Sequence, residues 1–180
     1  MTRPVLPPSR LPEAAAAAPP AMATPLATSE ARQVLLGNFA GHLFAALARK
    51  PPYTLRISAG LIDPGQPGTL LHAALVVAGC PPLPGRTLNT DALTILEVLG
   101  GGDEDLIRKV KLPAFRALPG CREIVLVQDR RIYCEVHRRL AGARWITDLL
   151  LDRDSRLRLD AAGLDLPLSV LYAQTGVVGA

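Results

Sequence analysis

Apolar residues occur in short runs that alternate with turns rich in glycine and proline, and each run predicts one element of secondary structure. Three segments have the capping residues or the apolar spacing of helices, and they lie at about 30–50, 104–118 and 166–172. Runs rich in aliphatic and β-branched residues predict six β-strands, at residues 53–62, 70–78, 93–99, 123–128, 132–138 and 143–151.

The helix predictions depend on particular residues. Ser29 is a favourable N-cap for the first helix, which ends at the pair of prolines after residue 50. Asp103 is expected to cap the second helix, in which Pro113 introduces a kink or a late start, and Pro167 suits the first turn of the third. Apolar side chains fall near one face of the first helix, and they are Leu36, Phe39, Leu43 and Leu47.

The order of these elements predicts a single α+β domain, in which helices pack on a mixed β-sheet. The domain is expected to span residues 29–177. Residues 1–28 are rich in proline and alanine and lack periodicity, so we predict a disordered leader there. The sequence contains no internal repeat.

Composition narrows the possible functions. The chain has 180 residues, which suffices for one domain with a core, and no run approaches the roughly 18 apolar residues of a membrane span. No secretory signal is evident, so we expect a cytoplasmic protein without a membrane partner. A net charge of +4 permits binding to a polyanion, whereas 4% aromatic residues are too few for a base-stacking platform.

The three cysteines predict neither zinc nor a disulfide framework. Cys80, Cys121 and Cys134 are odd in number, widely spaced and without a Cys-x-x-Cys pair. We therefore expect all three to be small buried hydrophobic residues.

Glu97 is the leading candidate for chemistry. It lies near the end of a strand of apolar residues, where burial of a carboxylate is costly unless a cation, a metal or hydrogen-bond donors meet it. Lys111 follows fourteen residues later on the predicted second helix, and we expect it to fold back toward Glu97. A structural ion pair would explain the same two residues.

The turn between that strand and helix, Gly100-Gly-Gly-Asp-Glu-Asp105, allows two further interpretations. It is not a phosphate loop, because no Gly-Lys-Ser/Thr follows and three acids would repel a phosphate. Asp103, Glu104 and Asp105 could serve as metal ligands, but favourable placement at the positive end of a helix explains them better.

Other constellations are weaker. His42 and His137 lie in a predicted helix and a predicted strand, and the chain contains no nucleophile elbow, so a serine or cysteine hydrolase is unsupported. Four arginines are expected to gather around one hairpin, where they could contact a nucleic-acid backbone or remain solvated. These are Arg130, Arg131, Arg138 and Arg139.

The series of segments resembles the Uma-type restriction endonuclease family of the PD-(D/E)XK nuclease superfamily. The resemblance runs from about residue 31 to residue 177. Its best stretches are Ile-Leu-Glu-Val-Leu at 95–99, Lys-Leu-Pro-Ala-Phe-Arg-Ala-Leu-Pro at 111–119, Arg-Glu-Ile-Val-Leu-Val at 122–127, Arg-Ile-Tyr-Cys-Glu-Val at 131–136 and Leu-Asp-Leu-Pro-Leu-Ser-Val-Leu-Tyr at 164–172.

This resemblance implies a restriction-endonuclease-like sheet flanked by helices and a Mg²⁺-dependent hydrolysis of DNA phosphodiesters. It implies Glu97 and Lys111 as catalytic residues, with the metal at Glu97 and Val98, and it places Phe115 where an aromatic residue usually follows the lysine. Hard carboxylate oxygens suit Mg²⁺, and a lysine can stabilise charge on the phosphate.

The sequence departs from the family at one essential position. Ala73 and Ala74 stand where the family has Pro-Asp, so the metal-binding aspartate is missing. The nearest polar residue is His72, which with Glu97 suits softer cations than Mg²⁺ and is more simply a surface or capping residue. The leader also replaces an N-terminal helix and hairpin of the family.

Two hypotheses of function remain. The first is a Mg²⁺-dependent endonuclease. The second is a catalytically inactive nuclease-fold protein that binds DNA or another protein, with a homodimer through an exposed sheet edge as one form. A third acid within reach of Glu97 would favour the first hypothesis, whereas only Ala74 and His72 at that position would favour the second.

Overall fold

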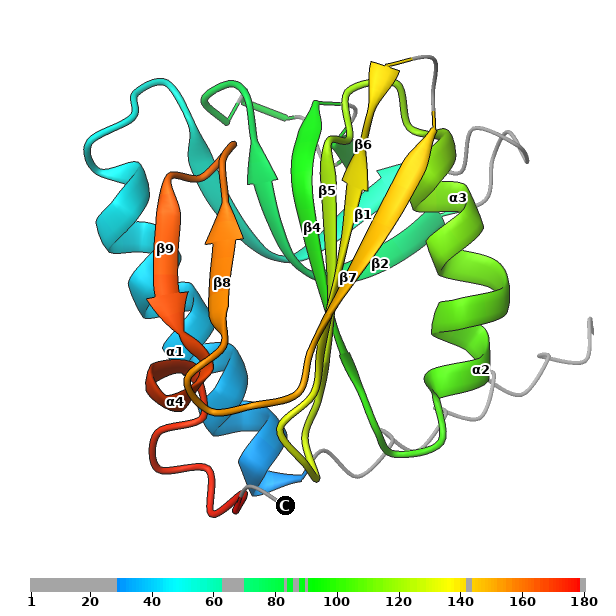
Figure 1. Cartoon of the computed structure of the whole chain (residues 1–180). Coiled ribbons are helices and arrows are strands. Elements are labelled where there is room, and N and C mark those ends of the chain that lie inside the picture. Colours follow the sequence, from blue (N-terminus) through cyan, green and yellow to red (C-terminus); the bar gives the residue numbers. More distant parts are fainter. Residues whose placement is uncertain are drawn as a thin grey trace, which may run out of the picture.

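A seven-stranded mixed β-sheet forms the centre of the molecule, and helices lie on both of its faces (Figure 1). The computed structural model describes residues 29–62, 70–82, 84–85, 88–89, 91–141 and 144–178. The helical elements are α1 (Glu30–Leu47), α2 (Glu104–Leu106), the π-helical segment η1 (Ile107–Lys111), α3 (Leu112–Ala117) and α4 (Leu168–Leu171). The strands are β1 (Thr54–Ile62), β2 (Leu70–Ala78), β3 (Leu88–Asn89), β4 (Ala92–Leu99), β5 (Glu123–Gln128), β6 (Cys134–Arg139), β7 (Trp145–Leu150), β8 (Arg156–Leu159) and β9 (Leu164–Pro167).

The strand order is β3-β1-β2-β4-β5-β6-β7. Strands β4 and β5 are parallel, so the chain must cross over one face of the sheet between them, and it does so through α2, η1 and α3. Strand β4 is antiparallel to β2, and β5 to β6. Helix α1, α4 and the hairpin of β8 and β9 cover the opposite face (Figure 1).

Two layers of apolar side chains fill the spaces on either side of the sheet. Leu35, Phe39 and Leu43 of α1 pack in the first layer with Val98 of β4 and with residues of α4 and the β8–β9 hairpin. The second layer contains Phe115 of α3, together with inward residues of β4 and β5. Because strand side chains alternate between faces, neighbouring residues of β4 belong to different layers.

The predicted α+β class, with a mixed sheet flanked by helices in one domain, is confirmed. Ser29 caps α1 through its Oγ, as predicted. The predicted burial of Phe39, Leu43 and Leu47 on one face of α1 is confirmed, but Leu35 is the fully buried leucine at the start of that face and Leu36 is only partly buried. The predicted leader at 1–28 lies outside the described residues.

The β8–β9 hairpin was not predicted from the sequence. Its first part is a charged segment, in which Arg156 and Arg158 alternate with two buried leucines. The predicted helix at 166–172 begins only at Leu168, because the preceding residues through Pro167 form β9. This hairpin extends the cover over the α1 face of the sheet.

Among the cysteines, Cys121 and Cys134 are fully buried, as predicted, whereas Cys80 is half-buried and its Sγ lies 2.7 Å from Asp91 Oδ2. All three are free thiols. No helix in the described part of the chain combines the length and the apolar character required to cross a membrane.

Candidate active site at Glu97 and Lys111

Glu97 projects from β4 toward the helices α2 and α3. Its neighbours Leu96 and Val98 belong to the core layer on the α1 side, and alternation therefore directs Glu97 to the other face. Only 2% of the residue is exposed. A carboxylate buried this deeply requires a partner, and the helix supplies it.

Lys111 is that partner, as the sequence predicted. Its Nζ lies 2.8 Å from Glu97 Oε1 and donates a second hydrogen bond, of 2.7 Å, to the carbonyl oxygen of His72 on β2. The lysine thus joins the helix to two neighbouring strands at one point. Its side chain remains 18% exposed, so one end of the pair is open to solvent.

Burial is the main influence on Glu97, and it raises the pKa of the carboxyl group above its ordinary value. The charges of Lys111 and Arg32 oppose this effect, while the charge of Asp103 adds to it. Arg32 and Asp103 form an ion pair of 3.2 Å with each other. Two acids and two cations therefore share this end of β4.

The helix that carries Lys111 changes its geometry at this site. The sequence predicted a kink or late start at Pro113, and the structure has a π-helical turn, η1, directly before it, which continues into α3. Proline lacks an N–H and its ring crowds the preceding turn, which disfavours regular α-helical bonding there. Such π-turns in helices are frequent at functional sites.

Ala74 leaves the position beside Glu97 without a ligand atom. The last pair between β2 and β4 joins Leu75 to Leu96, and the next residues along the two antiparallel strands are Ala74 and Glu97. An aspartate at 74 would lie next to the Glu97 carboxylate, but the methyl group of Ala74 cannot bind a metal.

The other predicted metal residue, Val98, has a fully buried apolar side chain, so only its main-chain carbonyl could contribute an oxygen. His72 is exposed, and it takes part in the site through its carbonyl group. Within the described ranges, no group of three or more His, Cys, Asp or Glu side chains is arranged to hold a metal ion.

The three acids after β4 have different environments. Asp103 is the N-cap residue of α2, as predicted, but its side chain makes no capping hydrogen bond. Its Oδ1 accepts from the Gly100 amide at 3.3 Å and its Oδ2 contacts Arg32. Glu104 pairs with Arg108 and Asp105 with Lys109, both at 2.8 Å and one helical turn away. Glu104 and Asp105 also lie in the first turn of the helix, which is the favourable placement that we predicted for them.

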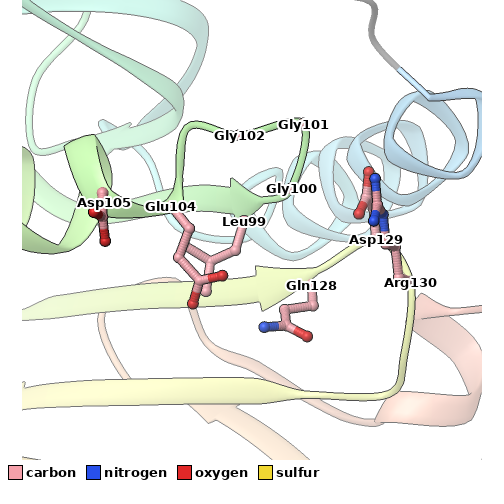
Figure 2. Close-up of a pocket in the computed structure, with 9 residues that line it drawn as sticks. All are labelled: Leu99, Gly100, Gly101, Gly102, Glu104, Asp105, Gln128, Asp129 and Arg130. Carbon is pink, nitrogen blue, oxygen red and sulfur yellow. The ribbon is translucent and has the colours of Figure 1, made fainter.

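A pocket lies beyond the end of β4, where the glycine turn and the charged residues around it form the lining. Figure 2 shows the glycine loop arching over it, with Glu104 on one side and Asp129 and Arg130 on the other. Asp129 Oδ2 accepts a 2.5 Å hydrogen bond from Ser29 Oγ, which ties the start of α1 to the end of β5. Carboxylates dominate this pocket, in agreement with our rejection of a phosphate loop.

A buried polar cluster beside Glu97 had no signal in the sequence. Glu135 of β6 contacts Arg108 Nη2 at 2.5 Å and His137 Nε2 at 3.3 Å, and the Tyr133 hydroxyl donates to it. Burial alone would raise the pKa of Glu135, but its contacts with His137, Arg108 and Tyr133 hold it well below its usual range. Only the pairing of β5 with β6 brings this cluster to the same face as Glu97.

The four arginines predicted around one hairpin do not form one group. Arg130 and Arg131 lie in the turn between β5 and β6. Arg138 lies opposite Glu123 in the strand register, at the end of the two strands that is farthest from this turn. Arg139 bonds to the carbonyl oxygens of Arg116 and Leu118. The expected cluster is therefore divided between opposite ends of β6.

Comparison with known proteins identifies the fold. No protein-family model matches the chain, and no curated protein matches it in sequence. The fold is similar to the crystal structure of a putative nuclease belonging to DUF820 from Anabaena variabilis ATCC 29413, with a TM-score of 0.64. The match covers 82% of this chain and 83% of that one, at 9% sequence identity. The protein has a nuclease-like fold.

Proposed function

We propose that the protein is an endonuclease of the Uma type that hydrolyses DNA phosphodiesters with Mg²⁺, and that Glu97 and Lys111 are its catalytic residues. The contact of 2.8 Å between the buried Glu97 carboxylate and Lys111, within a nuclease-like fold, is the observation that carries this proposal. Both residues were predicted from the sequence, and the fold brings them together.

The donor atoms meet the minimum that Mg²⁺ requires. This ion is usually held by one or two carboxylates, and it keeps several waters or takes phosphate oxygens from the substrate. Glu97 supplies one carboxylate, and the carbonyl of Val98 could supply a second oxygen. Without an aspartate at Ala74, we expect weak binding of the ion in the absence of DNA.

The residues divide the work of hydrolysis between them. A bound metal would lower the pKa of a water molecule and offset charge on the scissile phosphate. Glu97 would hold that metal on the rigid strand β4. Lys111, with its exposed end, would place a positive charge beside the phosphate as negative charge develops in the transition state.

Two measurements test the proposal together. Calorimetry would measure Mg²⁺ and Mn²⁺ binding by the full chain, with and without an uncleavable DNA duplex, and a plasmid-nicking assay would measure cleavage. We expect Glu97→Gln to lose metal binding and nicking, and Lys111→Met to lose nicking while retaining metal. Nicking that survives in Glu97→Gln would refute this site.

The second candidate is a nuclease-fold protein that has lost catalysis and acts by binding DNA or another protein, including a second copy of itself. The absence of a ligand at Ala74 favours this alternative. DNA binding by the wild type without metal binding or nicking would establish it. In that case the Glu97–Lys111 pair would only join the helix to the sheet.

A further inference from the structure

Two adjoining hollows lie where β5 begins and β6 ends, and cationic side chains dominate both. Lys50, Arg122, Arg138 and Arg139 line the first, and Arg138, Arg156 and Arg158 line the second. The hollows share Arg138 and Asp160, so they form one continuous depression. Six cations and three acids, namely Glu123, Asp148 and Asp160, contribute to the linings. The Arg139 guanidinium is occupied at the end of α3, where it bonds to two main-chain carbonyls and stacks on Trp145, so five cations remain for a ligand.

Two of these cations keep their charge largely unneutralised. Lys50 Nζ bonds to the main-chain carbonyl of Asp160 at 3.0 Å. In the part of the chain that the structure describes, the Arg122 side chain makes no hydrogen bond or ion pair and is exposed. A carbonyl fixes the position of a cation without cancelling its net charge.

The other three cations are held in place by carboxylates. Arg138 pairs with Asp148 and also donates to the carbonyl of Arg158, whereas Arg156 and Arg158 share Asp165 at 2.8 and 3.2 Å. Arg156 and Arg158 lie on the outer face of β8, because the alternate residues of that strand are buried. Arg138 of β6 is joined to them through the carbonyl of Arg158, so the three arginines form one wall of the depression.

The acids inside the depression offset only a small part of its positive charge. Glu123 is 4% exposed, and its carboxylate accepts hydrogen bonds from Thr94 Oγ1 and from the main-chain amide of Asp160, so it faces inward. Burial raises the pKa of Glu123, which disfavours its charged form. Asp148 and Asp160 are both exposed, but Asp148 is paired with Arg138. Asp160 makes no ion pair within the described residues, so it is the principal acid that an anionic ligand would meet.

We propose that this depression, defined by Lys50, Arg122, Arg138, Arg156 and Arg158, binds the phosphodiester backbone of a nucleic acid. Arginine presents a planar fork that matches phosphate oxygens, and four of the five cations are arginines. The cations line a recess between strands, which suits a chain of phosphates and not a flat bilayer. This inference rests on the proposed function in one respect, namely that nucleic acid is chosen as the anionic ligand.

This site is separate from Glu97. Arg122 precedes β5 and Arg138 lies at the end of β6, whereas Glu97 lies toward the opposite end of the parallel pair β4 and β5. Binding at the depression would hold DNA at a distance from the point of cleavage. Substrate affinity and chemistry would then depend on different residues.

Fluorescence polarisation with a labelled DNA duplex, in EDTA and at several salt concentrations, tests the inference on the full chain. We expect Arg122→Glu and Arg158→Glu each to weaken binding roughly tenfold near 0.1 M salt and to reduce the salt slope by about one, as loss of a phosphate contact does. Asp160→Asn should strengthen binding. Arg130→Glu makes the same charge change at the other end of β6 and should have little effect.

Equal weakening by Arg130→Glu, or no change in the Arg122 and Arg158 variants, would overturn the inference. So would binding to phosphatidylserine vesicles without binding to DNA. The Glu97→Gln variant separates this inference from the proposed function, because it should bind DNA normally in EDTA. If Glu97→Gln loses nicking but binds DNA normally, both the DNA-binding inference and the catalytic assignment are supported. Persistent nicking by this variant refutes only the catalytic assignment.

Discussion

Arg108 and Lys111, three residues apart on one helix, contact two different carboxylates of the sheet. Arg108 reaches Glu135 at 2.5 Å and Lys111 reaches Glu97 at 2.8 Å. Both acids are level with Leu126 of β5, which pairs with Glu97 on one side and with Glu135 on the other. The wider turn of the π-helical segment spreads the two cations, so the pairs fix both the position and the rotation of the helix.

Replacement of Lys111 by methionine should destabilise the fold by about 3 kcal/mol, because it leaves Glu97 buried without its cation. Urea unfolding at pH 7 measures this difference. Lys109→Met is a matched control on the same helix, since the Lys109–Asp105 pair is highly exposed and should change stability by at most about 0.5 kcal/mol. Equal losses in the two variants would contradict the buried role of Lys111.

The pH dependence of stability should reveal the burial of Glu97. Its pKa in the folded protein is raised, so the unfolded chain releases this proton at a lower pH than the folded chain does. The stability from protonated Glu97 is complete below about pH 4.5 and is lost as pH rises through the folded pKa. As the pH rises from 4 to 8, the unfolding free energy of the wild type should therefore fall relative to that of Glu97→Gln. Parallel curves would refute it.

Glu135 should show the opposite sign, because its hydrogen bonds lower its pKa. The stability that it contributes is present above about pH 4.5 and is lost as pH falls through the folded pKa. We expect Glu135→Gln to cost about 2 kcal/mol at pH 7 and progressively less toward pH 3. A deficit that stays constant over this range would show that packing, and not charge, accounts for the loss.

Ala74→Asp should restore the missing ligand. The new carboxylate would stand beside Glu97, and an added charged ligand should tighten Mn²⁺ binding roughly tenfold or more. Calorimetry measures the affinity, and Ala74→Asn is the control of similar shape without the charge. Nicking that rises with the affinity would support the first proposed function. Tighter binding without nicking would favour the inactive alternative.

Gly100→Ala and Gly37→Ala should have effects of opposite sign. Gly100 has a φ of +150°, and an added Cβ would lie 2.4 Å from Asp129 Oδ1, so this substitution should cost at least about 1 to 3 kcal/mol. Gly37 lies in α1 with no atom within 4 Å of an added Cβ, and alanine there should stabilise by about 0.5 to 1 kcal/mol. Thermal unfolding compares the two, and a neutral Gly100→Ala would show that the turn can relax.

The hydrophobic pattern by itself determined most of the elements. The strands β2 and β5 agree with their predicted bounds to the residue, and α1 begins at its predicted cap. These features depend on alternation and capping, which are local properties of the chain. The Glu97–Lys111 contact was also predictable, because only the glycine-rich loop after β4 and about two turns of the following helix separate the two residues.

Only the tertiary structure decided the surroundings of that pair. Arg32 meets Asp103 because the start of α1 lies near the end of β4, and Glu135 lies in the row of Glu97 because β5 pairs with both β4 and β6. No local pattern encodes such contacts. The same pairing divided the four arginines that the sequence had grouped and gathered a different set at the other end of the sheet. Periodicity reports which face a residue takes, whereas the pairing of distant strands decides which residues share it.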